Sequence, residues 1–230
     1  MRQFVIADIH GCNTTFLALL DKISFSTTDE LYLLGDYIDR GPDSLGVLET
    51  ILRLKNTGYS VHCLRGNHEQ MFLDAPDKAD YYNQWAADKE TKWFGFSKDR
   101  YIPALDAAQM AFLEHLPFVL EVGCYILVHG GLNFNQDNPL LPTHQMMWLR
   151  YWYDKINYTW LSDRYILHGH TPVKGRDMAL MHAELEVQRV LNLDNGCVFT
   201  SMGLGHLACF ELGSQSLIFQ KNIEKNGLLW

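Results

Sequence analysis

The sequence predicts an α/β fold made of two packed, mixed β-sheets flanked by helices. Three features of the apolar pattern support this prediction. Short apolar runs alternate with helical stretches early in the chain, most runs are continuous, and the last runs follow one another without room for helices. Continuous runs are typical of strands buried on both faces. A βαβαβα order followed by mostly β structure indicates two sheets with helices outside them.

Eight apolar runs account for the predicted strands. They span residues 4–7, 31–34, 61–64, 125–128, 165–167, 190–193, 206–212 and 216–220. Helices are predicted beside the early runs, and each begins after a polar residue that can cap it. These caps are Asn13 before 14–23, Asp43 or Ser44 before a helix that ends near residue 56, and Asp106 before 107–115.

The whole chain, residues 1–230, is expected to form a single domain, since one α/β domain can reach this length. Two stretches, about 77–100 and 133–164, interrupt the alternation and are expected to be insertions over the sheet. Insertions of this length often carry substrate contacts. The second is rich in Trp and Tyr, and we expect most of these rings to pack on the core.

The composition argues against several classes of protein. The 27 acidic and 19 basic side chains give a formal net charge of −8, whereas a general nucleic-acid binder needs a basic face. The five cysteines are odd in number and form no C-x-x-C motif, so neither a disulfide framework nor a zinc ribbon is expected. The N-terminus lacks a signal-peptide pattern, and no apolar run approaches the ~18 residues of a membrane helix. We therefore expect a cytoplasmic protein with no membrane or nucleic-acid partner.

Polar residues of metal-binding type follow five successive predicted strands. In chain order they are Asp8 and His10, then Asp36, then Asn67 and His68, then His129, then His168 and His170. Because the carboxyl ends of strands line the ligand crevice of an open α/β sheet, these side chains can converge on one point. Any one of them alone is typical of a turn or a cap, but five sets in series are hard to obtain by chance.

The chemistry of this set favours metal binding. It offers carboxylates, an amide oxygen and several imidazoles, with no thiolate beside them except Cys12. Such mixed ligands suit manganese, iron, zinc or nickel better than calcium or copper(I). There are too many ligands for one ion, whereas two divalent ions about 3.5–4 Å apart would use them all. Such a pair clamps a phosphate and lowers the pKa of a bridging water toward about 7, so that hydroxide can attack phosphorus in line.

Five motifs together resemble the signature of the calcineurin-like metallophosphoesterases. They are Asp8-x-His10-Gly11, Gly35-Asp36-x-x-Asp39-Arg40-Gly41, Arg65-Gly66-Asn67-His68-Glu69, His129-Gly130-Gly131 and Gly169-His170-Thr171. Within that group the chain is similar to the phosphoprotein phosphatase family, in the bacterial branch typified by the bacteriophage lambda protein phosphatase. The resemblance runs from residue 1 to about 196 and includes Asp194-Asn195-Gly196.

The resemblance implies a set of metal ligands. Asp8 and His10 would bind the first metal, Asp36 would bridge both metals, and Asn67, His129 and His170 would bind the second. Both ions would be divalent, with manganese expected first and iron, zinc or nickel as alternatives. His168 could compete with His170, but the family pattern places the ligand directly after Gly169.

The same resemblance implies the groups that act on the substrate. His68 would be the general acid that protonates the leaving alkoxide, and Asp39 would orient it. Arg40 and Arg65 would hold phosphate oxygens, which suits the fork geometry of guanidinium. Arg150 lies in a segment that resembles the family's W-x-R and is a further candidate for the phosphate.

The function implied is hydrolysis of phosphate monoesters by a metal-dependent serine/threonine protein phosphatase, acting on a phosphorylated protein or a small phosphate ester. The alternative is a symmetrical diadenosine tetraphosphate hydrolase, from a sister group that typically lacks the second Asp of G-D-x-x-D-R-G and reads G-N-H-D. Asp39 and Glu69 favour the phosphatase, whereas the aromatic insertion could stack on adenine. A non-catalytic scaffold that binds phosphorylated partners should have lost part of the machinery, and no motif residue departs from the pattern. The acidic charge disfavours a nuclease.

Overall fold

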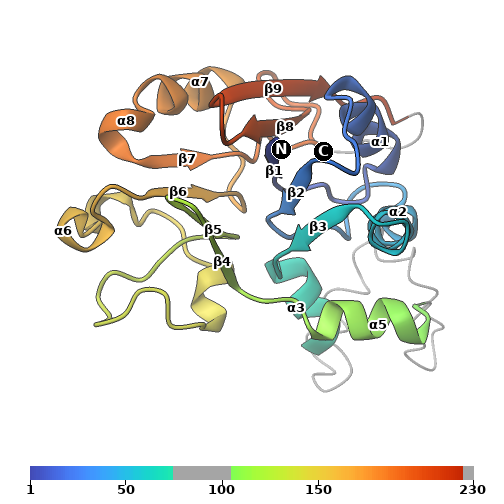
Figure 1. The fold of residues 1–230 in the computed structure, drawn as a ribbon, viewed down its shortest axis with the longest axis horizontal. Coiled ribbons are helices and arrows are strands. Elements are labelled where there is room, and N and C mark those ends of the chain that lie inside the picture. Colours follow the sequence, from blue (N-terminus) through green and yellow to red (C-terminus); the bar gives the residue numbers. More distant parts are fainter. Residues whose placement is uncertain (75–104, 225–230) are drawn as a thin grey trace.

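The strands form two mixed sheets, as predicted (Figure 1). The computed structural model describes residues 1–74 and 105–224, so the insertion expected over 77–100 lies outside the described residues. The five-stranded sheet contains, from edge to edge, β3 (Ser60–Cys63), β2 (Glu30–Leu33), β1 (Gln3–Ile6), β8 (His206–Glu211) and β9 (Ser216–Lys221). The four-stranded sheet contains β4 (Val119–Val122), β5 (Tyr125–Val128), β6 (Tyr165–His168) and β7 (Val190–Asn192).

Each sheet has a parallel half whose strands all run in one direction. β1, β2 and β3 are parallel neighbours, as are β5, β6 and β7, whereas β4, β8 and β9 pair antiparallel. All eight predicted strands are confirmed, each within one residue of its expected bounds. β4 was not predicted, because its side chains are only partly buried and Glu121 interrupts its apolar run.

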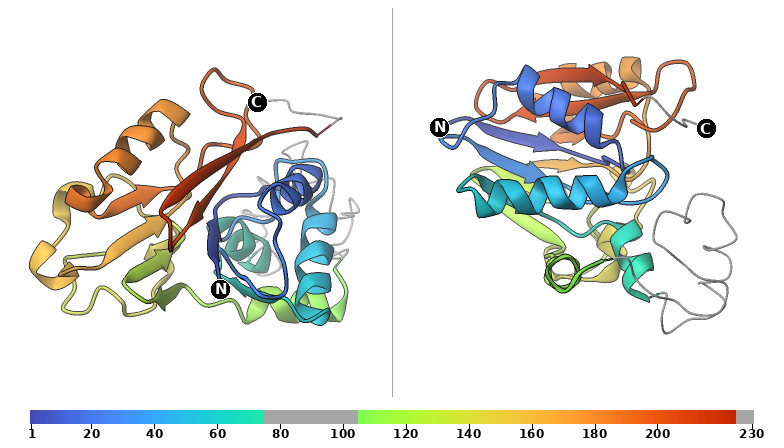
Figure 2. Two further views of the ribbon diagram at one scale, coloured as in Figure 1. Left: turned by 45° about the horizontal axis from the view of Figure 1, so that its top comes forward. Right: turned by 90° about the vertical axis from the view of Figure 1, so that its right-hand side faces the viewer.

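Two helices cover the outer face of the five-stranded sheet (Figure 2). They are α1 (Asn13–Lys22) and α2 (Ser44–Asn56). Asp43 caps α2 by accepting a backbone N–H of its first turn at 2.9 Å. The predicted cap of α1 is wrong. Asn13 is already helical, and its side chain instead donates to Asp43 and accepts from Thr50, which ties the two helices together.

The other helical segments of the described residues are shorter. They are α3 (Asn67–Asp74), α5 (Ala107–Glu114), η3 (His144–Met147), η4 (Tyr153–Lys155), α6 (Tyr158–Leu161), α7 (Gly175–Ala183) and α8 (Leu185–Gln188). The predicted cap of α5 is confirmed as a reciprocal capping box between Asp106 and Gln109. Between residues 1 and 74 and between 105 and 224, no helix has the length and apolar character needed to cross a bilayer.

The expectation that no helix separates the late strands is wrong. α7 and α8 connect β6 to β7 and bury Met178 and Leu185 in the core between the sheets. Most of the other side chains of α7 and α8 are exposed or half-buried. Because few positions are apolar and buried, the helical period of these segments is weak in the sequence.

The period of two along each strand divides its side chains between different cores. In β1, Phe4 and Ile6 face the core shared with α1 and α2, while Val5 lies between the sheets. In β5, Leu127 lies between the sheets, while Ile126 faces the segment 133–164. The two sheets therefore pack face to face, and each has a further apolar layer on its outer side.

Fewer aromatic rings of the segment 133–164 pack on the core than expected. Trp152 is buried and donates its indole N–H to the carbonyl of Gly130 at 2.9 Å. Trp160 is half-buried beside it, in the same apolar cluster. Four other rings are at least 41% exposed, namely Trp148, Tyr151, Tyr153 and Tyr158. The expectation that most of the Trp and Tyr rings in this segment pack on the core is therefore wrong.

Candidate metal centre

The residues predicted from the strand ends converge at one buried place. Asp8, His10, Asp36, Asn67, His68, His129 and His170 are each less than a tenth exposed. Two groups of three side chains have ligand atoms within 4.8 Å of one another: His10, Asp36 and His68, and Asp36, His129 and His170. Asp36 belongs to both groups, which is the geometry required of a residue that bridges two ions.

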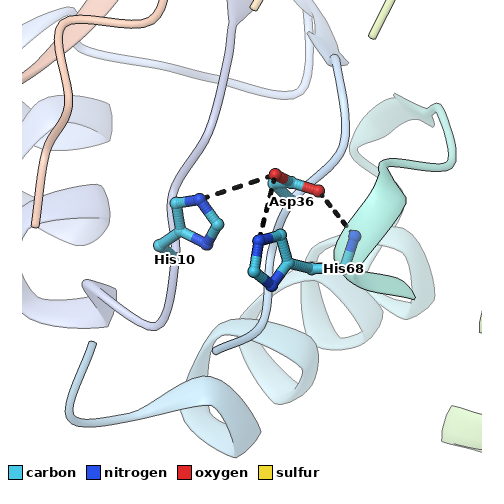
Figure 3. A group of neighbouring side chains, drawn as sticks. All are labelled: His10, Asp36 and His68. Carbon is cyan, nitrogen blue, oxygen red and sulfur yellow. Dashed lines mark hydrogen bonds and ion pairs between the residues drawn. The ribbon is translucent and has the colours of Figure 1, made fainter. Parts of the chain in front are cut away.

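Both carboxylate oxygens of Asp36 face histidines, and Figure 3 shows the rings of His10 and His68 beside the same oxygen. Oδ2 lies 3.5 Å from His10 Nε2 and 3.9 Å from His68 Nε2. Oδ1 lies 3.4 Å from His129 Nε2 and accepts the backbone N–H of His68 at 3.0 Å. Burial works against the charged carboxylate, but His129 and His68 outweigh it and hold the pKa of Asp36 well below its usual range. The centre of the site therefore carries a negative charge.

Backbone carbonyls orient two of the histidines. His10 Nδ1 donates to the carbonyl of Ile38 at 2.9 Å, and His129 Nδ1 donates to the carbonyl of Leu34 at 2.9 Å. Each ring therefore turns Nε2 toward Asp36. Metal-ligating histidines commonly donate their other ring N–H to a carbonyl, which fixes the tautomer and the ring orientation.

Burial and neighbouring charge set the pKa values of these rings. Burial lowers the pKa of His10 well below its usual range, and the charge of Arg40 acts in the same direction. Burial and His129 lower the pKa of His170 to about 3. Burial also opposes the charge on His129, but the Asp36 carboxylate outweighs it and raises the pKa to about 10. The Asp36 carboxylate thus favours a positive charge on the neighbouring His129, whereas burial keeps His10 and His170 neutral, the form in which imidazole binds a metal.

Asn67 adds an amide oxygen to the second group. Its Oδ1 lies 3.0 Å from His129 Nε2 and 2.8 Å from His170 Nδ1. Imidazole nitrogens, an amide oxygen and a shared carboxylate form a mixed donor set that suits divalent transition metals. The residues of both groups therefore fit a pair of such ions.

Asp8 lies beside the group of Asp36, His129 and His170, and its side chain contacts the backbone of His170. Its carboxylate accepts the N–H of His170 at 3.0 and 3.1 Å. Gly169 makes this approach possible, because a Cβ there would lie 1.9 Å from Asp8 Oδ2. Burial, reinforced by the neighbouring Asp194, raises the pKa of Asp8 well above its usual range. Asp8 is not in either group of three in the part of the chain that the structure describes.

His68 and Asp39 form a hydrogen-bonded pair beside Asp36. His68 Nδ1 donates to Asp39 Oδ2 at 2.7 Å. Burial lowers the pKa of His68, but the carboxylates of Asp36 and Asp39 outweigh it, so the pKa is raised. An imidazole held protonated in this way can donate a proton from Nε2, the nitrogen that faces Asp36.

Arg40 and Arg150 border the ligand groups from two sides. Arg40 is half-buried, with its guanidinium 5.6 Å from the ring centroid of Phe199. Arg150 is exposed, and its Nε donates to His170 Nε2 at 3.1 Å. Both therefore present positive charge near the centre.

Arg65 occupies a different position. Its Nη1 donates to Gln70 Oε1 at 2.8 Å, and its Nη2 donates to the carbonyl of Glu114 at 2.6 Å. The head of this side chain thus lies against α3 and α5. Its hydrogen bonds in the described residues do not bring it together with the other two arginines.

Left-handed backbone conformations gather at this centre. Of eleven non-glycine residues with positive φ among those described, six belong to the predicted site: Asp8, His10, Asp36, Asp39, Arg40 and His170. Residues with a Cβ adopt this conformation rarely, and it persists where the surrounding structure enforces it. The backbone strain is therefore concentrated in the strand-end loops that carry the site residues.

Sequence reasoning missed two buried carboxyls of the site. Glu69 was noted only as a family marker, although its carboxylate accepts four backbone N–H groups. Burial raises its pKa to about 7. Asp194 accepts the N–H of Gly196 at 2.7 Å, and burial raises its pKa to about 6. The position of Glu69 three residues after Gly66 is a capping signal that could have pointed to its bond with the N–H of Gly66, but not to the other three.

His168, the competitor of His170, lies outside both groups. Its Nδ1 donates to the carbonyl of Gly169 at 3.0 Å, and its Nε2 accepts the hydroxyl of Tyr153 at 2.7 Å. Both ring nitrogens are therefore engaged away from Asp36.

The sequence matches known proteins over most of its length. The family model of the calcineurin-like phosphoesterases matches residues 1–199. The serine/threonine-protein phosphatase 1 of Salmonella typhimurium is 31% identical over 210 residues, which cover 85% of this chain and 87% of that protein. The symmetrical bis(5'-nucleosyl)-tetraphosphatase of Nitrosomonas europaea is 34% identical over 134 residues, which cover 57% of this chain and 45% of that protein.

A solved structure shares the fold. A crystal structure provisionally assigned as a diadenosine tetraphosphatase aligns with a TM-score of 0.69 at 18% identity, covering 98% of this chain and 95% of that chain. At this identity the likeness concerns the fold alone.

Proposed function

The chain belongs to the calcineurin-like phosphoesterase family, and from that premise we propose that it is a two-metal phosphatase of the serine/threonine protein phosphatase type. Its substrates would be phosphate monoesters, foremost phosphoserine and phosphothreonine in proteins. The Salmonella phosphatase, similar over 85% of this chain, supports the proposal.

The observation that carries the proposal is the Asp39–His68 pair. The alkoxide of serine or threonine is a poor leaving group and must be protonated as the bond to phosphorus breaks. His68 Nδ1 is held by Asp39 at 2.7 Å, which leaves Nε2 as the proton donor on the side of Asp36. A nucleotide phosphate leaves more easily and needs such an acid less, so the pair favours the monoester.

The proposal assigns six metal ligands. Asp8 and His10 would hold one ion, Asn67, His129 and His170 would hold the other, and Asp36 would be shared. When bound, two divalent cations neutralise phosphate charge and supply a nucleophile at neutral pH. Manganese is the metal we propose first, with iron, zinc and nickel as the alternatives.

Arginines would hold the phosphate itself. Arg40, half-buried over Phe199, is positioned to bind a phosphate oxygen with its fork of N–H donors. Arg150 now donates to His170 Nε2. An imidazole that ligates through Nδ1 keeps its proton on Nε2 and has no lone pair there for Arg150, which would then be free for phosphate. Arg65 would need to leave Gln70 and Glu114 to take part.

Symmetrical cleavage of diadenosine tetraphosphate is the second candidate. The Nitrosomonas tetraphosphatase supports it, although the chain spans less than half the length of that protein. Trp148 is 41% exposed, with its ring centroid 6.3 Å from that of His170, and could stack on adenine.

The test uses metal-stripped full-length protein to which manganese is added back. A phosphoserine peptide and diadenosine tetraphosphate are assayed side by side, with the Asp36→Asn variant as the blank for contaminating activity. Phosphate release from the peptide in preference to dinucleotide cleavage is expected. Preferential cleavage of the dinucleotide would reject the phosphatase in favour of the second candidate. Parallel additions of iron, zinc and nickel identify the metal.

We further propose that the chain is one domain and acts in the cytoplasm. Its five cysteines are all free, which suits a reducing compartment.

A further inference from the structure

The backbone segment 36–38 connects β2 to the Asp39–His68 pair and carries the carboxylate shared by both ligand groups. All three of its N–H groups donate to the carboxylate of Glu69. Asp36 donates to Oε2 at 2.8 Å, while Tyr37 and Ile38 donate to Oε1 at 2.8 and 3.3 Å. Glu69 is fully buried, so no water competes for these donors.

The carbonyls of the same segment are all bonded to the loop that follows β1. The carbonyl of Asp36 accepts the N–H of His10 at 2.9 Å, and that of Tyr37 accepts the N–H of Gly11 at 2.8 Å. The carbonyl of Ile38 accepts His10 Nδ1 at 2.9 Å. The orientation of the His10 ring is therefore determined by the position of the Ile38 carbonyl, on a peptide segment that Glu69 holds from the other side.

The first turn of α3 completes the arrangement. The Glu69 carboxylate also accepts the N–H of Gly66 at 2.9 Å, and the Asp36 carboxylate accepts the N–H of His68 at 3.0 Å. Each carboxylate thus binds the backbone of the other's loop. This reciprocal exchange fixes Asp36 relative to His68 (Figure 3).

We propose that Glu69 is a positioning residue of the metal centre, which acts through the segment 36–38 to aim the Asp36 carboxylate and the His10 imidazole at the same point. The inference rests on the proposed two-cation site. Four converging N–H donors require two acceptor oxygens, which a carboxylate offers and an amide does not. The side chain must also be long enough to reach from α3 to Ile38, which aspartate, shorter by one methylene, is not expected to do.

Metal affinity distinguishes positioning from a purely structural role. Glu69→Gln keeps the shape of the side chain but places an NH₂ group against two backbone N–H donors. Glu69→Asp keeps the negative charge but moves the carboxylate away from the segment 36–38, because the side chain is shorter by one methylene. Tyr37→Phe is the matched control. Its buried hydroxyl donates to the carbonyls of Leu33 and Leu64 at 3.1 and 2.7 Å, so its loss weakens the same region without touching the bonds to Glu69.

The experiment is titration of metal-stripped full-length protein with Mn²⁺ by calorimetry, together with hydrogen exchange of the amides of residues 36–38. Loss of a group that orients a ligand commonly costs about 10- to 100-fold in metal affinity. We expect a loss of this size for Glu69→Gln, a smaller one for Glu69→Asp, and none for Tyr37→Phe. Faster exchange at residues 36–38 is expected in Glu69→Asp, with the amides of β2 unchanged.

Two results would overturn the inference in different ways. If the wild type binds Mn²⁺ and Glu69→Gln binds it equally well, Glu69 does not position the ligands. Should Glu69→Gln fail to fold, Glu69→Asp decides the same question by its affinity and exchange. If the wild type binds neither Mn²⁺ nor Fe²⁺, Zn²⁺ or Ni²⁺, the proposed two-metal function fails, and this inference fails with it.

Discussion

Replacement of Asp39 by Asn should slow the hydrolysis of esters with poor leaving groups far more than that of esters with good ones. The Asp39 carboxylate accepts His68 Nδ1 at 2.7 Å, and both side chains are buried. A hydrogen bond to a charged group contributes about 1.5–3 kcal/mol. Since 1.36 kcal/mol is a factor of ten in rate, kcat for a phosphoserine peptide should fall about 10- to 150-fold. An activated aryl ester, whose leaving group needs no proton, should lose much less.

The assay compares kcat and KM for a phosphoserine peptide and for p-nitrophenyl phosphate, at saturating manganese. The bound metal of each variant is measured, because the change should leave the ligands in place. Asp163→Asn, at an exposed position, controls for the change of charge. His68→Asn should reproduce the leaving-group dependence, and the double variant should be little worse than His68→Asn alone, since the two residues act as one unit.

Two results would refute this reasoning. Equal losses for the two esters would mean that the Asp39–His68 pair does not protonate the leaving group. Fully additive losses in the double variant would mean that Asp39 acts elsewhere than through His68.

Four further predictions concern other parts of the chain. Asp36→Asn should abolish turnover, because both ligand groups lose their shared carboxylate; a tenth of wild-type activity would contradict this assignment. Arg40→Ala should weaken inhibition by free phosphate with little change in metal content, and unchanged inhibition would remove it from the site. Gly169→Ala places a Cβ 1.9 Å from the Asp8 carboxylate. Overpacking of this kind costs about 1–3 kcal/mol, which corresponds to a fall of about 2–12 °C in Tm for a chain of this size. An unchanged Tm in thermal unfolding would contradict this prediction. The hydrogen bond from Arg2 lowers the pKa of Asp29 to about 2. The ionised Asp29 carboxylate therefore stabilises the folded state at pH values above about 4, and this stabilisation is lost as the pH falls from 4 toward 2. The Tm deficit of Asp29→Asn should therefore narrow over that range, and a constant deficit would contradict the argument.

The site was predictable because it rests on local patterns at strand ends. A continuous apolar run followed at once by Asp or His is visible in the sequence, and parallel strands carry such ends to one edge. Packing of the two sheets then places these edges together, so that Asp36 after β2 and His129 after β5 lie 3.4 Å apart, although 93 positions separate them in the sequence. The Asp39–His68 pair was predicted by the family resemblance alone. Roles that depend on one residue at a known motif position were therefore accessible without coordinates.

The features that were missed depend on three-dimensional context. β4 is a strand because it pairs with β5, and its own apolar pattern is too weak to predict it. α7 and α8 are held by a few buried side chains, so their period in the sequence is weak. Glu69 looks like an ordinary residue in the first turn of a helix, and only the path of the segment 36–38 shows what its carboxylate binds. Tertiary hydrogen bonds of this kind leave no periodic signal.

Hydrogen bonds between residues of the metal centre also connect the two sheets. Asp8 at the end of β1 accepts the N–H of His170 at the end of β6, and His129 at the end of β5 donates to the carbonyl of Leu34 after β2. These bonds cross from one sheet to the other at the strand ends, where the apolar core between the sheets gives way to polar groups. The Asp8–His170 bonds also help to hold the left-handed conformations of these two residues, since a strained backbone persists only where the surrounding structure enforces it. Residues of the metal centre are therefore themselves part of the contact between the two sheets.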